Sequence, residues 1–265
     1  MKLALLSDIH SNRQALDACL QHARAHGADH FALLGDLVGY GADPAYVVQQ
    51  AMDLVAAGYT VIGGNHDAFA VQPPAGTDKG AHSMAAQGAL WTHEQLSPEQ
   101  RSFLAHLPLT AQVGGVLLVH ASAEAPENWR YVDNEIVAAE CLEAATKHPG
   151  VKHVFCGHVH QQTLYYRCTG RGLMRFTPTA GVPVPVPPHR QWVGTVGSVG
   201  QPRDGDPRAM YALLDTDHWH LRFERVPYAV ADAAAAILAT RGALPASFAH
   251  RLEVGRRNCW NPAPW

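Results

Sequence analysis

Five short apolar runs in the first 160 residues each stop at an Asp, Asn or His, and this repeated pattern constrains the fold more than any other feature. The runs cover residues 3–7, 31–34, 60–62, 116–119 and 154–156. Each run has the length of a strand and is too apolar to be exposed. The pattern therefore predicts strands that are buried on both faces.

Segments with helical periodicity separate these runs, at residues 12–25, 44–57, 84–107 and 135–147, with a break in the third near Ser97 and Pro98. Strands that alternate with helices are typical of an α/β fold. In such folds, ligands bind beyond the carboxyl ends of the strands. Since every polar cluster follows a strand, we expect side chains from distant parts of the sequence to meet in one pocket.

After His160 the pattern changes to hairpins, in which residues 163–167 pair with 173–177 and residues 210–214 pair with 218–225. Between the hairpins, residues 182–188 consist of valine and proline. Proline has no N–H to donate to a sheet, so we expect an extended surface loop there. Helices at 230–240 and 245–253 close the chain. We predict one domain over residues 1–265, with a core at 1–160 and the hairpins and C-terminal helices at 161–265.

The composition excludes several other classes of protein. With 47% hydrophobic residues and a formal net charge of −3, the chain is neither disordered nor a basic nucleic-acid-binding protein. Its five cysteines are scattered and odd in number, which argues against a disulfide framework and favours a reducing compartment. The N-terminal apolar run meets Asp8 too early for a signal peptide, and no stretch is long enough to span a membrane. We therefore expect a cytoplasmic protein.

Two pairs of polar residues have the spacing of metal ligands. Asp8 and His10 are two residues apart, and so are His158 and His160. In an extended segment, residues two apart point to the same side, so each pair can hold one metal ion.

Three further residues complete a larger set of ligands. Asp36 can bridge two ions through its two carboxylate oxygens, and Asn65 and His120 offer further oxygen and nitrogen ligands. Carboxylates combined with imidazoles suit divalent transition metals rather than magnesium or calcium. We therefore predict two divalent metal ions, manganese first, with iron, zinc or nickel as alternatives.

The candidate ligands lie in five segments: Asp8-Ile9-His10, Gly35-Asp36, Gly64-Asn65-His66-Asp67, His120 and Gly157-His158-Val159-His160. In order and spacing, these segments resemble the five signature blocks of the calcineurin-like metallophosphoesterases. Residues 39–44 and 197–204 are similar to loops of the small bacterial branch of this family, which includes phosphodiesterases and hydrolases of diadenosine polyphosphates.

The resemblance implies a four-layer αββα sandwich, in which helices flank two mixed β-sheets and the metal site lies at the carboxyl ends of the strands. The late hairpins would extend the second sheet. The family's general acid corresponds to His66. The implied ligands are Asp8, His10, Asp36 and His160 for the first ion, and Asp36, Asn65, His120 and His158 for the second.

The predicted function is hydrolysis of a phosphodiester or phosphoanhydride in a small nucleotide-like substrate, without stable binding to nucleic acid or membranes. Two neighbouring cations lower the pKa of a shared water to about 7, which gives a bridging hydroxide that attacks phosphorus. His66 would protonate the leaving group. A broad phosphomonoesterase is the alternative. A non-catalytic scaffold is disfavoured because His66 and all seven ligand positions are present.

Two residues near these blocks have alternative roles. Asn12 either caps the helix that follows it or contacts the substrate. Tyr40 either stacks on a substrate base or packs in the protein. The remaining histidines are expected to be structural or on the surface: His22, His26, His30, His82, His93, His106, His148, His153, His189, His218, His220 and His250.

Overall fold

The computed structural model describes residues 1–73, 84–167 and 172–256, and two six-stranded sheets form its centre. The first sheet contains, in spatial order, β3 (Thr60–Ile62), β2 (His30–Leu34), β1 (Lys2–Leu6), β11 (Ala209–Asp215), β12 (His220–Val226) and β9 (Val184–Pro185). The second contains β4 (Thr110–Val113), β5 (Val116–Val119), β6 (His153–Cys156), β10 (Trp192–Val196), β7 (Gln162–Arg167) and β8 (Leu173–Phe176). Both sheets are mixed, because β1, β2 and β3 run parallel, as do β5, β6 and β10, while all other neighbours are antiparallel.

Helices flank the two sheets. They are α1 (Arg13–Ala25), α2 (Pro44–Ala56), α3 (Asn65–Val71), α4 (Met84–Gln95), α5 (Pro98–Ala105), α6 (Glu135–Ala145), α7 (Val230–Leu238), α8 (Ala246–Val254) and the 3-10 turn η1 (Pro126–Asn128). The break predicted near Ser97 is confirmed. The Ser97 hydroxyl accepts the Gln100 N–H at the start of α5, and the Gln100 side chain accepts the Ser97 N–H in return.

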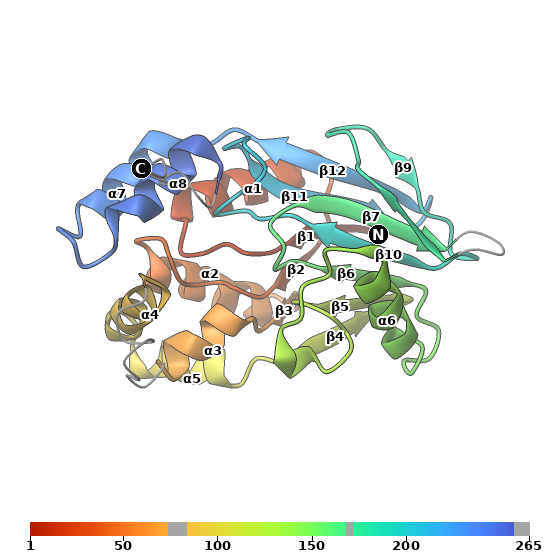
Figure 1. Cartoon of the computed structure of the whole chain (residues 1–265), viewed down its shortest axis with the longest axis horizontal. Coiled ribbons are helices and arrows are strands. Elements are labelled where there is room, and N and C mark those ends of the chain that lie inside the picture. Colours follow the sequence, from red (N-terminus) through yellow and green to blue (C-terminus); the bar gives the residue numbers. More distant parts are fainter. Residues whose placement is uncertain (74–83, 168–171, 257–265) are drawn as a thin grey trace, which may run out of the picture.

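Alternation along β1 explains the four layers. Leu3 and Leu5 belong to the apolar layer between the two sheets, whereas Ala4 and Leu6 pack in the layer that includes α1 and α2. On the far side, α6 packs on the outer face of the second sheet. Figure 1 shows the C-terminal helices α7 and α8 beside α1, away from the β7–β8 hairpin. The predicted αββα sandwich is therefore confirmed.

One late hairpin occupies a different sheet from the one expected. The β7–β8 hairpin extends the second sheet beside β10, as predicted. The β11–β12 hairpin instead joins the first sheet, where Leu214 of β11 pairs with Leu3 of β1 and Ala212 pairs with Leu5. The expectation that both hairpins extend the second sheet is wrong. The edge of β1 opposite β2 accepts the hairpin, and Ala212 and Leu214 continue the apolar layer between the sheets.

The valine-proline segment forms a short edge strand within the predicted extended loop. Only β9, with two residues, pairs with β12 at the edge of the first sheet, which is the position that proline tolerates. None of the helices in the described part of the chain has both the length and the apolar character needed to cross a bilayer.

Candidate metal centre

The carboxyl ends of strands from both sheets meet at one place, and the polar side chains predicted from the sequence lie together there. Asp8 and His10 follow β1, Asp36 follows β2, Asn65 and His66 begin α3 directly after β3, His120 follows β5, and His158 and His160 follow β6. The seven predicted ligands are buried, and His66 is partly exposed.

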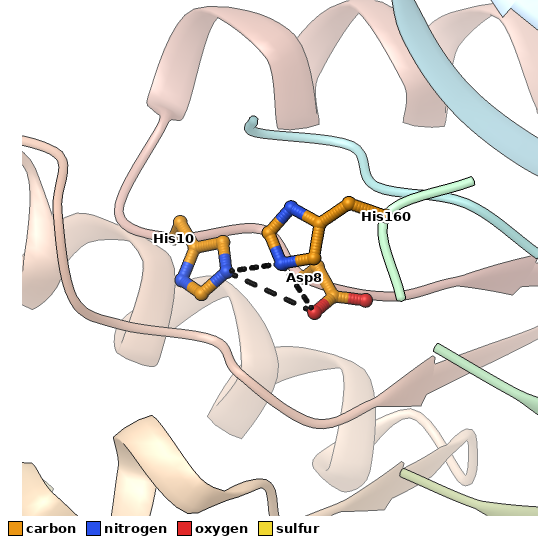
Figure 2. A group of neighbouring side chains, drawn as sticks. All are labelled: Asp8, His10 and His160. Carbon is orange, nitrogen blue, oxygen red and sulfur yellow. Dashed lines mark hydrogen bonds and ion pairs between the residues drawn. The ribbon is translucent and has the colours of Figure 1, made fainter. Parts of the chain in front are cut away.

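Asp8, His10 and His160 form one cluster, and Figure 2 shows their side chains pointing toward one another. The Nε2 atom of His160 lies 3.0 Å from Asp8 Oδ1. The Nε2 atom of His10 lies 3.8 Å from the same oxygen and 3.2 Å from His160 Nε2. Three ligand atoms thus surround one point.

Asp36 connects this cluster to a second one that contains His120 and His158. Asp36 Oδ2 lies 3.8 Å from His10 Nε2 and 3.3 Å from His120 Nε2. The Nδ1 atom of His158 lies 3.2 Å from His120 Nε2. The other carboxylate oxygen, Oδ1, accepts the backbone N–H of His66 at 2.8 Å. One carboxylate therefore faces ligand atoms on both sides.

Backbone carbonyls fix the orientation of three of these imidazoles. The Nδ1 atoms of His10, His120 and His160 lie 3.1, 2.7 and 2.6 Å from the carbonyl oxygens of Val38, Leu34 and Gln201. Each Nδ1 therefore carries a proton, and each Nε2 faces the centre.

This donor set fits bound cations. Lone pairs on His10 Nε2 and His160 Nε2 face each other at 3.2 Å, which is unfavourable unless a cation lies between them. The buried atoms Asp8 Oδ1 and Asn65 Oδ1 have no hydrogen-bond donor in the described part of the chain. Buried polar atoms without partners need an explanation, and metal coordination supplies one for both.

Burial keeps most of the imidazoles neutral. It lowers the pKa of His10 and His160, and it lowers the pKa of His158 to about 4. For His120 burial acts in the same direction, but the charges of Asp36 and Asp8, together with the hydrogen bonds to Asp36 and to the Leu34 carbonyl, raise its pKa to about 9. Neutral imidazoles are the form that binds metal ions.

The backbone at this site is strained. Asp8, His10, Asp36, His158 and His160 have φ values of 53°, 49°, 52°, 64° and 60°. Residues other than glycine rarely adopt this left-handed conformation, and it costs about 1–3 kcal/mol for each residue. Such strain concentrates at functional sites, where the surrounding structure holds it in place.

The two residues with alternative roles lie at the edge of the centre. The Asn12 side chain caps α1 by accepting the Ala15 N–H at 3.1 Å, and its amide donates to Gly200 O and to the Tyr228 hydroxyl. Both amide donors are used, which favours the capping role. The ring of Tyr40 contacts His10 and His66, with centroids 4.7 and 4.6 Å away.

Three other residues contact the site although no role was predicted for them. Asp67 accepts the N–H groups of Gly64 and Val38, which ties the segment after β3 to the segment after β2. Tyr131, in the loop after β5, stacks on His158. Arg203 lies beside Gln201, whose carbonyl accepts the Nδ1–H of His160. Asp67 belongs to one of the five blocks, and Arg203 belongs to the segment 197–204 that resembles a loop of the family, so both had a sequence signal. Tyr131 lies in a loop that had none.

His66 lies near two of the predicted metal ligands, His10 and Asp36. With His10 and Asp36 it forms a group whose donor atoms are near enough for one ion, so its geometry allows coordination as well as acid catalysis. None of the remaining described histidines belongs to these groups, and His82 lies outside the described residues.

Comparisons with known proteins agree with this geometry. The sequence profile of the calcineurin-like phosphoesterase superfamily domain matches residues 1–218. An uncharacterized protein of Methanocaldococcus jannaschii is 31% identical over 258 residues, which cover 96% of this chain and 98% of that protein. The crystal structure of a metallophosphoesterase from Sphaerobacter thermophilus has 32% identity and a TM-score of 0.81, over 96% of this chain and 100% of its own. A hypothetical protein from Pyrococcus horikoshii OT3 has a similar fold, with 20% identity and a TM-score of 0.73 over 97% of this chain and 99% of its own.

Proposed function

The chain belongs to the calcineurin-like phosphoesterase superfamily, and we propose that it hydrolyses a phosphodiester or phosphoanhydride bond in a small nucleotide-like substrate. One observation carries this proposal. Asp36 Oδ2 lies within 3.8 Å of His10 Nε2 and 3.3 Å of His120 Nε2, on opposite halves of the centre. A shared carboxylate is what a two-metal site requires.

In this proposal the ligands divide between two divalent ions. Asp8, His10, Asp36 and His160 hold the first, and Asp36, Asn65, His120 and His158 hold the second. The mixture of carboxylate and imidazole favours manganese, with iron, zinc or nickel as alternatives. When bound, such ions activate water and offset the charge of a phosphoryl group. The carbonyl-bound imidazoles keep the ligands in position before the substrate arrives.

His66 is proposed as the general acid. Its backbone N–H donates to Asp36 Oδ1 at 2.8 Å, and the residue is partly exposed, unlike the buried ligands around it. A Cβ at Gly39 would lie 2.7 Å from His66 Nδ1, so glycine permits the close approach of this ring. Burial lowers the pKa of His66, which makes its imidazolium a stronger acid than a solvated one. A proton held there can pass to a departing alkoxide.

A substrate panel tests the proposed bond preference. The manganese-loaded protein should cleave bis(p-nitrophenyl) phosphate faster than p-nitrophenyl phosphate. A faster rate on the monoester would instead support the broad phosphomonoesterase. Cleavage of diadenosine tetraphosphate alone would identify the phosphoanhydride as the target. Metal binding without turnover of any of the three would favour the non-catalytic scaffold.

A cytoplasmic location is also proposed. The thiols of Cys19, Cys141 and Cys156 are free and buried, and the other two cysteines lie outside the described residues. Free thiols persist in a reducing compartment.

A further inference from the structure

The loop at residues 197–203 is fixed against the end of β1, directly beside the proposed metal ligands. The Ser198 hydroxyl and the Gly200 N–H both donate to Asp8 O, at 2.8 and 2.9 Å. A Cβ at Gly200 would lie 1.8 Å from Ile9 O, so only glycine allows this approach. The loop is therefore held in a defined position relative to Asp8.

This loop brings Arg203 to the site. The carbonyl of Gln201 accepts the Nδ1–H of His160 at 2.6 Å, and the Gln201 side-chain oxygen lies 3.4 Å from Arg203 Nη2. Gln201 thus contacts the His160 ring through its backbone and the Arg203 guanidinium through its side chain.

Arg203 has no carboxylate partner in the described ranges 1–73, 84–167 and 172–256, although acidic residues follow it closely. Asp204 pairs with Arg225, and Asp206 pairs with Arg208. The Nε atom of Arg203 is buried and has no acceptor among the same residues. A buried donor on a cation is unfavourable without an acceptor, so the arrangement calls for an anion.

We propose that Arg203 binds an anionic phosphoryl oxygen of the substrate on the His160 side of the metal centre. The inference rests on the proposed phosphoesterase function, which supplies the anion. Guanidinium groups bind phosphate through parallel N–H donors, and Nε and Nη2 form such a pair. The guanidinium and two nearby metal ions would repel one another because all are positively charged. A negatively charged phosphoryl group bound between them would offset this repulsion.

Titration of the manganese-loaded protein with inorganic phosphate, followed by calorimetry, tests the proposal without turnover. Arg203→Ala should weaken phosphate binding by at least about tenfold, since a charge-assisted hydrogen bond is lost. Arg203→Lys should bind with intermediate affinity, because it keeps the charge and loses Nε. Arg175→Ala is the matched control, since Arg175 is exposed on β8, and it should bind phosphate like the parent.

Manganese content is measured for each variant to separate anion binding from metal retention. Unchanged phosphate affinity in Arg203→Ala overturns the proposal. If Arg203→Ala loses manganese, the Arg203→Lys variant provides the test instead. Parent-like phosphate affinity in Arg203→Lys with full manganese content would show that Nε does not bind the phosphate. Failure of the parent to cleave any ester, with phosphate binding still dependent on Arg203, would refute the proposed function but not the anion site.

Discussion

The ring of Tyr131 lies nearly parallel to the imidazole of His158, with centroids 3.9 Å apart and an interplanar angle of 22°. His158 differs from the other three proposed imidazole ligands. It faces the centre through Nδ1, and in the described part of the chain no backbone carbonyl accepts a hydrogen bond from its ring. Stacking on Tyr131 therefore takes the place of the carbonyl that orients each of the other rings.

Replacing Tyr131 with alanine should weaken the second metal site. Loss of a group that orients a metal ligand typically lowers affinity by about 10- to 100-fold. Tyr131→Phe should keep the parent affinity, because the stacked face is retained. Titration with manganese and measurement of bound metal check both variants.

A matched control separates stacking from the loss of an exposed aromatic ring. Phe176 on β8 is 41% exposed and Tyr131 is 40% exposed, so Phe176→Ala removes a similarly exposed ring away from the centre. Equal manganese affinity in Tyr131→Ala and Phe176→Ala would show that the stack does not support the metal site.

Asp36→Asn should abolish turnover while sparing the fold. The amide keeps the shape of the carboxylate and an oxygen acceptor for the His66 N–H, but it loses the negative charge that faces His10 and His120. We expect less bound metal by elemental analysis and an unchanged circular dichroism spectrum. Asp53→Asn, on the surface of α2, is the control and should retain activity. Parent-like turnover in Asp36→Asn would remove the bridging role.

His66→Ala should lower the rate by about 10²- to 10⁴-fold with metal content retained, as expected for loss of a general acid. The loss should be larger for an alkyl ester than for a nitrophenyl ester, because nitrophenolate leaves without protonation. Rates on the two esters and elemental analysis provide the measurements. Loss of one metal ion in this variant would instead make His66 a ligand, which its distance from His10 and Asp36 allows.

The strands and their terminal polar residues were predictable because their signal is local. A run such as residues 116–119 is apolar enough to be buried on both faces, and the residue that follows, His120, must find a partner at the strand end. Ser97 and Pro98 likewise define a helix start within one turn. Such patterns need no knowledge of distant residues.

The sheet membership of the late strands was not predictable from local pattern. The pairing of β11 with β1 joins residues more than 200 positions apart, and the nearly continuous apolar run of β11 fits the interior of either sheet. Tyr131 and Arg203 reach the site from loops whose sequences carry no periodicity. Their roles depend on where His158 and His160 lie in space, so they emerge only from the structure.

His153 should make the fold sensitive to acid. It is fully buried, its Nε2 lies 2.8 Å from Val186 O, and its ring stacks on Trp219 with centroids 4.4 Å apart. Burial lowers its pKa to about 4 from an ordinary value of 6.5. In the unfolded chain His153 binds a proton below about pH 6.5, whereas in the folded chain it does so only below about pH 4. The free energy of unfolding therefore falls as the pH drops through this range.

The size of this effect is measurable by urea unfolding across the window. At pH 5 the His153 contribution corresponds to a loss of about 2 kcal/mol in the free energy of unfolding relative to pH 7. His153→Gln keeps a side-chain donor for Val186 O but has no titrating ring, so its free energy of unfolding should fall less between pH 7 and pH 5. Comparing the two slopes removes the contribution of the histidines at the metal centre, which both proteins share. Identical slopes would mean that His153 takes up its proton equally well in the folded and unfolded chains.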